Sequence, residues 1–425
     1  MKNHYILFPL MIVVSLVLLH QVVQRSLVTQ QPKATTDPDS QMVDFLQRYI
    51  RINTAHPHPD YKGASSFLMR EARKDGFTAQ EITLSSGYPV VIITYEGNDP
   101  SLPSIALNHH MDVVPATNIQ DWITPPFAAE IRDGSIIGRG TQDMKGIGVV
   151  QYHALKALKD AGLRPRRTVH LLAVPEEEVG GFKGTKLLVQ TEAFKKLNIG
   201  TVIDEGVASD DEKQLLIKLT ERRPIQIEVT ARGQLAHGSH LACQNAAHDL
   251  IEFLESLVKL HKHSQLTAKK FHPGMLPSYN VTSLAAGSTA TLNVVPACAT
   301  ATVDIRVPPG MSLQEVKDYL DENMKVYPDI KYAIKAIATE ESILGLEESS
   351  LYKKLEEVCH KHGMTVAPHH FEASSDLRFY HALGIEGVGL TPFTCKENLH
   401  GTNESVPIKN LIQGRDILLD FLKSQ

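Results

Sequence analysis

Seven histidine, aspartate and glutamate side chains in this chain could together form a two-metal hydrolytic centre. Histidine nitrogens and carboxylate oxygens are the donors that zinc and similar divalent ions prefer at neutral pH. Two such ions, about 3.5–4 Å apart, can hold a water molecule and lower its pKa, and a nearby carboxylate can take its proton. The seven residues occur in five short segments and are His110, Asp112, Asp143, Glu177, Glu178, Asp204 and His400.

Five of the seven residues are predicted metal ligands. Two adjacent ions need a shared ligand, which a carboxylate with its two oxygens can provide. Asp143 lies in a glycine-rich turn at the start of a predicted helix, so we expect its exposed carboxylate to be the bridge. His110 and Asp204 are predicted to bind one ion. Glu178 and His400 are predicted to bind the other.

The other two residues are predicted to support the reaction without binding metal. Asp112 lies two residues from His110 and is placed to orient it, as carboxylates outside the ligand set commonly do. Glu177 directly precedes a ligand, so the backbone holds it near the metal-bound water. We therefore expect Glu177 to be the general base and later the proton donor. His109 adjoins His110 and is an alternative ligand.

The elements that must position these residues form a regular alternation of helix and strand. In a sheet built this way the strands are largely parallel, with helices on both faces, and ligands bind beyond the carboxyl ends of the strands. The predicted fold class is therefore α/β, with the two-metal hydrolytic centre on a domain built around a mostly parallel sheet. Apolar runs precede three of the site residues: Ile105–Leu107 before His110, Val169–Val174 before Glu177 and Thr201–Ile203 before Asp204.

The pattern changes near residue 214 and changes back near residue 338. Between them the order of predicted elements is strand, helix, strand, strand, helix, strand, which makes a compact α+β insert. The predicted organisation is a catalytic domain in two parts, 40–213 and 339–425, interrupted by a smaller domain at 214–338. A chain of 425 residues is also longer than one hydrophobic core usually serves.

The N-terminal segment predicts entry into the secretory pathway. Tyr5–Leu19 is almost wholly apolar and follows Lys2, which suits either a signal peptide or a signal anchor over residues 1–24. Residues 25–39 are polar and are predicted to form a stalk. Both alternatives predict a lumenal or extracellular catalytic domain, either secreted or anchored by a single span.

Composition excludes several other classes of protein. The net charge of -5 is too mild to indicate a nucleic-acid partner. Four cysteines without a Cys-x-x-Cys pair argue against a thiolate zinc site and against a disulfide scaffold. Asn280 and Asn403 lie in sequences that fit N-glycosylation, and the pattern alone does not decide whether either is modified.

The site segments resemble the motifs of the di-zinc aminoacylase/carboxypeptidase/dipeptidase family of metallopeptidases. The resemblance covers roughly residues 40–424. It implies two Zn²⁺ per subunit, a hydrolase that acts on linear amide bonds, and a cis peptide bond after Asp143. The segments that match are His110–Pro115, Arg139–Lys145, Glu177–Gly181, Asp204–Gly206 and Leu399–His400.

The same resemblance assigns roles to residues of the insert. It implies that the domain at 214–338 is a lid through which two subunits dimerise. His237, in the turn Ala236–Ser239, would stabilise the oxyanion, often across the dimer. Arg306, preceded by a turn that contains Asn293, would bind the free carboxylate of the substrate. Arg378, in a loop that faces the site in this family, is a further substrate-binding candidate.

The function implied is hydrolysis of N-acyl-L-amino acids to a carboxylate and a free L-amino acid, as in amino acid metabolism. The alternative is a dipeptidase or carboxypeptidase with the same di-zinc centre, which would differ only in what occupies the acyl side. A non-catalytic binding protein that keeps the fold is the third reading, and the intact set of seven residues argues against it. All three predict a small-molecule or short-peptide ligand.

Overall fold

The computed structural model describes residues 37–425 except 242, 289 and 395–397. The predicted signal peptide or anchor at 1–24 lies outside the described residues. The C-terminal boundary of the stalk predicted at 25–39 is too late, because helix α2 (Pro38–Ile50) already begins at Pro38. Among the described helices, none has the length and apolar content needed to cross a bilayer.

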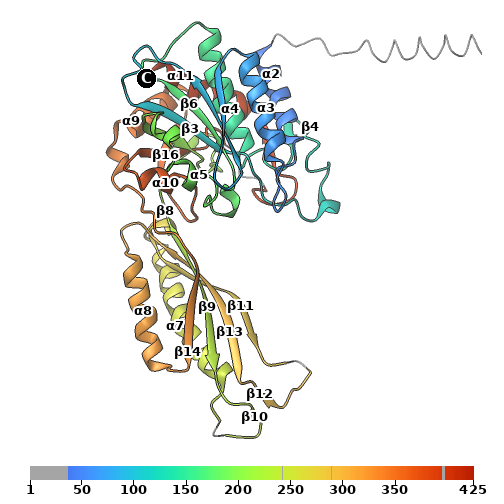
Figure 1. The fold of residues 1–425 in the computed structure, drawn as a ribbon, viewed down its shortest axis with the longest axis vertical. Coiled ribbons are helices and arrows are strands. Elements are labelled where there is room, and N and C mark those ends of the chain that lie inside the picture. Colours follow the sequence, from blue (N-terminus) through green and yellow to red (C-terminus); the bar gives the residue numbers. More distant parts are fainter. Residues whose placement is uncertain (1–36, 242, 289, 395–397) are drawn as a thin grey trace, which may run out of the picture. The chain divides into compact units, whose positions relative to one another are not determined.

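The main sheet has eight strands in the order β1-β2-β6-β3-β7-β16-β8-β15 (Figure 1). Its centre is parallel, since β3 pairs in parallel with both β6 and β7, and β7 with β16. Strands β3 and β6 are buried along their whole length, which explains why they are apolar runs in the sequence. The predicted mostly parallel sheet is therefore confirmed. The strands are β1 (Thr78–Thr83), β2 (Pro89–Tyr95), β3 (Ser104–His110), β6 (Val169–Val174), β7 (Ile199–Asp204), β8 (Gln214–Glu221), β15 (Thr365–Phe371) and β16 (Glu386–Leu390).

Helices pack on this sheet, and one of them begins beside a site residue. Helix α4 (Lys145–Asp160) contacts β3 and β6 and begins two residues after Asp143. The peptide bond Asp143–Met144 is cis, as the family resemblance implied. The remaining helices of this part are α3 (Tyr61–Lys74), α5 (Thr185–Leu188), α6 (Glu192–Lys195), α9 (Ser350–Lys361), α10 (Leu377–His381) and α11 (Ile408–Lys423), with short 3₁₀ turns η1 (Ile119–Asp121), η2 (Glu177–Val179) and η4 (Leu346–Glu348).

A small three-stranded sheet joins two segments that are far apart in the sequence. Its strands are β4 (Glu130–Arg132), β5 (Ser135–Ile137) and β17 (Ser405–Pro407), in the order β17-β5-β4. Ser405 pairs with Ile137. The loop that carries His400 is thereby held next to the loop that leads to Asp143.

A second, antiparallel sheet has the order β11-β13-β9-β14 and is flanked by two long helices (Figure 1). Burial alternates along β9 and β13, and their buried side chains share one apolar core with α7. The order of elements along the chain is the one predicted for the insert. They are β9 (Arg223–Arg232), α7 (Ala246–Thr267), η3 (Pro273–Met275), β11 (Ser278–Ala286), β13 (Cys298–Val307), α8 (Leu313–Val326) and β14 (Ile330–Ile337), with β10 (Ala236–His237) paired to β12 (Val294–Val295) at one end.

The structure moves one predicted domain boundary. A lid beginning at residue 214 would include β8, yet β8 pairs with β15 and β16 in the eight-stranded sheet. The second sheet begins with β9 at Arg223. Only Arg222 separates the two strands, so the strand pattern continues across the boundary and hides it in the sequence.

Candidate metal centre

The candidate centre lies at the carboxyl ends of three neighbouring parallel strands. His110 is the last residue of β3, and Glu205 directly follows β7. The turn η2, which begins at Glu177, follows β6 after two residues. Strands β6, β3 and β7 are adjacent in the sheet, so their ends bring these residues to one edge.

Asp143 lies between two histidines and faces each with a different oxygen. Its Oδ1 lies 2.9 Å from His110 Nε2, and its Oδ2 lies 2.9 Å from His400 Nε2. This is the arrangement that a carboxylate shared by two ions requires. Asp143 belongs to two groups of three residues, and within each group the ligand atoms lie within 4.8 Å of one another. The groups are His110, Asp143 and Glu205, and Asp143, Glu178 and His400.

The structure replaces one predicted ligand, Asp204, by its neighbour Glu205. Glu205 Oε2 lies 3.2 Å from His110 Nε2. The buried Asp204 carboxylate turns away and accepts a hydrogen bond from Asn108 Nδ2 at 2.8 Å. Successive side chains at a strand end point to opposite sides, so only one of two adjacent carboxylates can face the centre. The prediction that Asp204 binds metal is therefore wrong in this structure.

A buried lysine places a cation beside the carboxylates behind the centre. Lys218 Nζ donates to Ser375 Oγ at 2.6 Å and lies 4.0 Å from Glu205 Oε1. Burial lowers the pKa of Lys218, but the carboxylates of Glu205 and Glu221 outweigh burial and raise it above its ordinary value. Lys218 was not predicted as a site residue, since a single lysine within a strand has the pattern of a solvated charge.

Asp112 has a different role from the one predicted. His110 Nδ1 donates to the backbone carbonyl of Asp112 at 2.9 Å, whereas the nearer carboxylate oxygen is 3.8 Å away. The Asp112 carboxylate instead accepts the backbone N–H groups of Glu177 at 3.2 Å and Glu178 at 3.1 Å. Asp112 thus orients the histidine through its backbone, and its side chain fixes the turn η2.

Glu177 faces the centre without belonging to either ligand group. Its Oε2 lies 3.9 Å from His110 Nε2. Burial, and then the neighbouring carboxylate of Glu205, raises the pKa of Glu177 well above its ordinary value. A carboxylate with a raised pKa accepts and returns a proton more readily near neutral pH, which suits the predicted general base.

His109 lies in the core and is no ligand in this arrangement. A Cβ atom on Gly148 of α4 would lie 2.4 Å from His109 Cδ2, so the ring packs directly on the helix. Burial lowers the pKa of His109 to about 3. The alternative that His109 replaces His110 as a ligand is therefore not supported by its position.

A buried ion pair fixes the backbone on both sides of the centre. Arg139 Nη1 lies 2.6 Å from Glu404 Oε2, and both side chains are buried. Glu404 Oε1 accepts the backbone N–H of Gln142 at 2.8 Å, next to Asp143. Arg139 Nη2 donates to the carbonyl of His400 at 3.0 Å. His400 has a φ of 59°, which a non-glycine residue keeps only where its surroundings hold it.

Replacing Glu404 by Gln is expected to lower the free energy of unfolding by about 3–5 kcal/mol, because the Arg139 charge would stay buried without a counter-charge. Denaturant unfolding would measure the loss, and zinc content would fall with it. The matched control is Glu357→Gln, which breaks an exposed pair with Lys361 at 2.7 Å and is expected to leave the unfolding midpoint nearly unchanged. Equal midpoints for the two variants would contradict the proposed scaffold.

The two arginines predicted to bind substrate line the same cavity as the candidate base. The cavity measures about 480 Å³ and includes Glu177, Glu178 and His400 in its wall together with Arg306 and Arg378. Arg306 is held by Asp304, with Nε 2.7 Å from Oδ1. The cavity is therefore large enough for a small molecule. Arg378 Nη1 and Nη2 donate to the carbonyls of Ser375 and Gly180, so Arg378 is fixed in the cavity wall.

His237 and Asn293 do not line this cavity. They lie on the paired strands β10 and β12 and their neighbouring turn, where Asn293 Nδ2 is 3.1 Å from His237 Nε2. Both side chains are exposed. Within one chain, the structure does not bring these two predicted residues to the centre.

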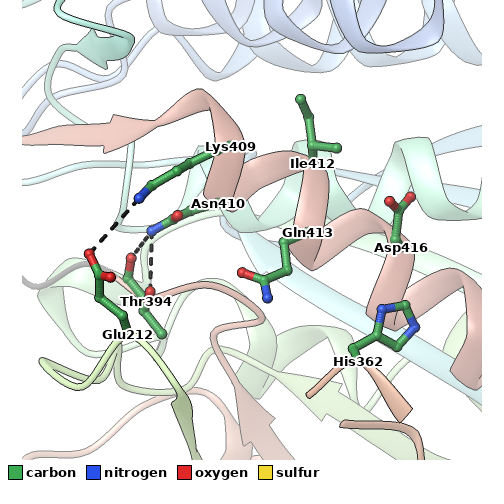
Figure 2. A pocket seen from close by; sticks show the side chains of 8 residues that line it. All are labelled: Glu212, His362, Thr394, Lys409, Asn410, Ile412, Gln413 and Asp416. Atoms are coloured by element: carbon green, nitrogen blue, oxygen red, sulfur yellow. Dashed lines mark hydrogen bonds and ion pairs between the residues drawn. The ribbon is translucent and has the colours of Figure 1, made fainter. Parts of the chain in front are cut away.

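Another hollow, of about 410 Å³, lies along α11 (Figure 2). Its polar side chains pair with one another: Lys409 Nζ lies 3.9 Å from Glu212, and Asn410 Nδ2 lies 3.3 Å from Thr394 Oγ1. His362, also in its wall, is paired with Asp420 at 2.9 Å. None of the candidate metal ligands lines this hollow, so the candidate active site remains the cavity beside Glu177.

Taken together, the parallel sheet, the shared Asp143 and the glutamate beside the ligands define a metal-dependent hydrolase. The chain belongs to peptidase family M20/M25/M40, whose model matches residues 106–424. It is 33% identical to aminoacylase-1 of Mus musculus over 399 residues, 92% of this chain and 97% of that protein. It is 31% identical to aminoacylase-1 of Dictyostelium discoideum over 402 residues, 90% and 97% of the two chains.

A solved structure shares the fold. The M20 family metallo-carboxypeptidase Sso-CP2 from Sulfolobus solfataricus matches with a TM-score of 0.73 and 20% sequence identity. The match covers 92% of this chain and 99% of that one, so the likeness in fold extends over almost all of both chains.

Proposed function

We propose that this protein is a zinc-dependent hydrolase that cleaves N-acyl-L-amino acids to a carboxylate and a free L-amino acid. The observation that carries the proposal is the cavity whose wall contains Arg306 and Arg378 together with Glu177 and four of the five candidate ligands. The likeness to aminoacylase-1 over 92% of the chain supports the same substrate class.

The donor set suits zinc. Two histidine nitrogens and three carboxylates, with Asp143 in common, would provide three protein ligands to each of two ions: His110, Asp143 and Glu205, and Asp143, Glu178 and His400. Bound zinc would supply an acidified water and polarise the scissile carbonyl.

The side chains of this chain would then divide the remaining work. Glu177 would take the proton of the attacking water and return it to the leaving amine. Arg306 and Arg378 would hold the free carboxylate of the amino acid and so align the amide.

A second, smaller cavity complements this assignment. It measures about 70 Å³, borders Asp143 and Glu205, and is walled by apolar side chains that include Ile147 and Leu399. An N-acyl-amino acid has one charged half and one apolar half, joined at the amide. The cavity with the arginines suits the charged half, and the small apolar cavity suits the acyl group.

We propose that the protein acts as a homodimer through the second sheet. Strand β11 is an unpaired edge of that sheet and exposes Val281 and Leu284, which a second copy could cover. His237 and Asn293 lie outside the cavity of their own chain, and a partner subunit could bring them to it. In the dimer, His237 would stabilise the oxyanion.

We further propose that the protein enters the secretory pathway, secreted or anchored by a single span. The support is the apolar segment Tyr5–Leu19 in the sequence. Of the two glycosylation sequences, the Asn280 side chain is exposed on β11. Asn403 is engaged in the fold, since its Oδ1 accepts the Ile123 N–H at 2.7 Å.

A substrate panel with zinc-loaded, full-length protein tests the proposed reaction. We expect N-acetyl-L-methionine to be hydrolysed with a higher kcat/KM than dipeptides of matched size. A higher kcat/KM for the dipeptides would replace the proposal by the dipeptidase alternative. Failure to bind zinc together with no hydrolysis of either class would indicate a non-catalytic protein.

A further inference from the structure

A histidine not used in the reaction above, His56, reaches the centre from the segment that follows α2. Its Nε2 lies 2.8 Å from Oδ2 of Asp112. An ionised carboxylate only accepts hydrogen bonds, so the ring nitrogen is the donor. The side chain of His56 is 15% exposed and that of Asp112 is 0% exposed, so the bond is largely shielded from water.

The carboxylate that receives this bond controls two functional residues together. Asp112 Oδ1 accepts the Glu177 N–H, and Asp112 Oδ2 accepts the Glu178 N–H. A rotation of the Asp112 side chain would therefore displace the candidate base and a ligand at the same time. His56 supplies a further donor that fixes the orientation of this carboxylate.

The backbone that presents His56 is tied to the segment that contains Asp112. The Val113 N–H donates to the Thr54 carbonyl, and the His56 N–H donates to the Val113 carbonyl, each at 3.2 Å. Thr54 Oγ1 donates to the Met111 carbonyl at 2.6 Å. Because these bonds flank Asp112 on both sides, the imidazole is held in place relative to the carboxylate before substrate binds.

We propose that His56 is a positioning residue of the metal centre, which acts through Asp112 to hold Glu177 at the attacking water and Glu178 at its ion. The inference rests on the proposed zinc centre. Residues that orient metal ligands from outside the ligand set typically change metal affinity or activity by about 10–100-fold when removed.

The test uses full-length, zinc-loaded protein. His56→Leu is expected to lower kcat by about 10–100-fold and to change KM little, since the arginines that hold the substrate are untouched. His56→Gln keeps an N–H donor and is expected to recover most of the lost activity. His58→Leu is the matched control, because His58 lies two residues further on and is exposed; its kcat should equal that of the wild type.

A double-mutant cycle separates positioning through Asp112 from a general loss of stability. Zinc affinity, measured by competition with a chromophoric chelator, is compared for His56→Leu, Asp112→Asn and the double variant. If His56 acts through Asp112, the double variant should lose little more affinity than Asp112→Asn alone. Additive losses, or a kcat of His56→Leu equal to that of the wild type, would overturn the inference.

The same measurements distinguish this inference from the proposed function. If the wild type cleaves only dipeptides, the proposed substrate class fails, and the His56→Leu effect is then measured on the dipeptide with the same expected loss. If the wild type cleaves N-acyl-amino acids and His56→Leu is fully active, the proposed function stands and the role of His56 is refuted. A zinc affinity that falls equally in His58→Leu also refutes it.

Discussion

Replacing Glu177 by Gln is expected to lower kcat on N-acetyl-L-methionine by roughly 10²–10⁴-fold while both zinc ions remain bound. The amide has nearly the size of the carboxylate but cannot take a proton from water. Glu177 lies outside both three-residue ligand groups, so its loss should leave metal binding intact. Steady-state kinetics and zinc content, measured on the same preparation, check the two halves of the expectation.

The adjacent Glu176 provides a matched control for this variant. It belongs to the same run of three glutamates, but its carboxylate points away and accepts the backbone N–H of Lys183. Glu176→Gln keeps an acceptor for that bond and is expected to reduce kcat far less than Glu177→Gln. Full turnover by Glu177→Gln would show that another group is the base, and loss of zinc would show that Glu177 is a ligand.

The parts of the fold that the sequence predicts correctly are those with a strong local pattern. Strand β6 is predicted at its observed position because all six of its residues are buried and apolar residues dominate it. The insert is predicted because its central strands β9 and β13 alternate buried and more exposed residues, with two helices along the same stretch. Strands β4, β5 and β17 have three residues each, too few to show any period, and they are missed.

The candidate site is predicted to the extent that neighbouring residues define it. His110, Asp143 and Glu178 are predicted because each lies beside a recognisable element: His110 ends β3, Glu178 lies in the turn after β6, and Asp143 lies two residues before α4. The pair Arg139 and Glu404 is 265 residues apart, so no local pattern connects it, although it fixes the backbone beside two ligands. The side-chain role of Asp112 is missed for the same reason, because its partners lie on η2 and in the segment containing His56.

The prediction of Asp204 in place of Glu205 shows that the sequence at the end of a strand does not identify which of two adjacent carboxylates faces the site. Asp204 and Glu205 come immediately after the apolar run that ends at Ile203, and from the sequence either side chain could face the centre beyond the strand. What decides the question is the surroundings: Asn108 and Ser375 offer hydrogen bonds to Asp204 on one side, and His110 faces Glu205 on the other. Neither environment is visible from the two residues themselves.

Replacing Glu205 by Ala is therefore expected to weaken binding of one zinc ion by more than about 100-fold, while the other ion stays bound. The lost ion is the one that Glu205 shares with His110 and Asp143, because the group of Glu178 and His400 keeps all its donors. A zinc titration against a competing chelator should change from two tight sites to one, and kcat/KM should fall with it, because the water would lose one of the ions that acidify it.

Asp204→Asn is the control that distinguishes Glu205 from Asp204 as the metal ligand. The amide oxygen can still accept the hydrogen bond from Asn108, so the fold should persist, and both zinc ions should bind with affinities within about tenfold of the wild type. The opposite result, in which Asp204→Asn loses an ion and Glu205→Ala keeps two, would restore Asp204 as the ligand. Equal losses in both variants would mean that the two carboxylates act as one unit, with the buried Lys218 ammonium balancing their combined charge.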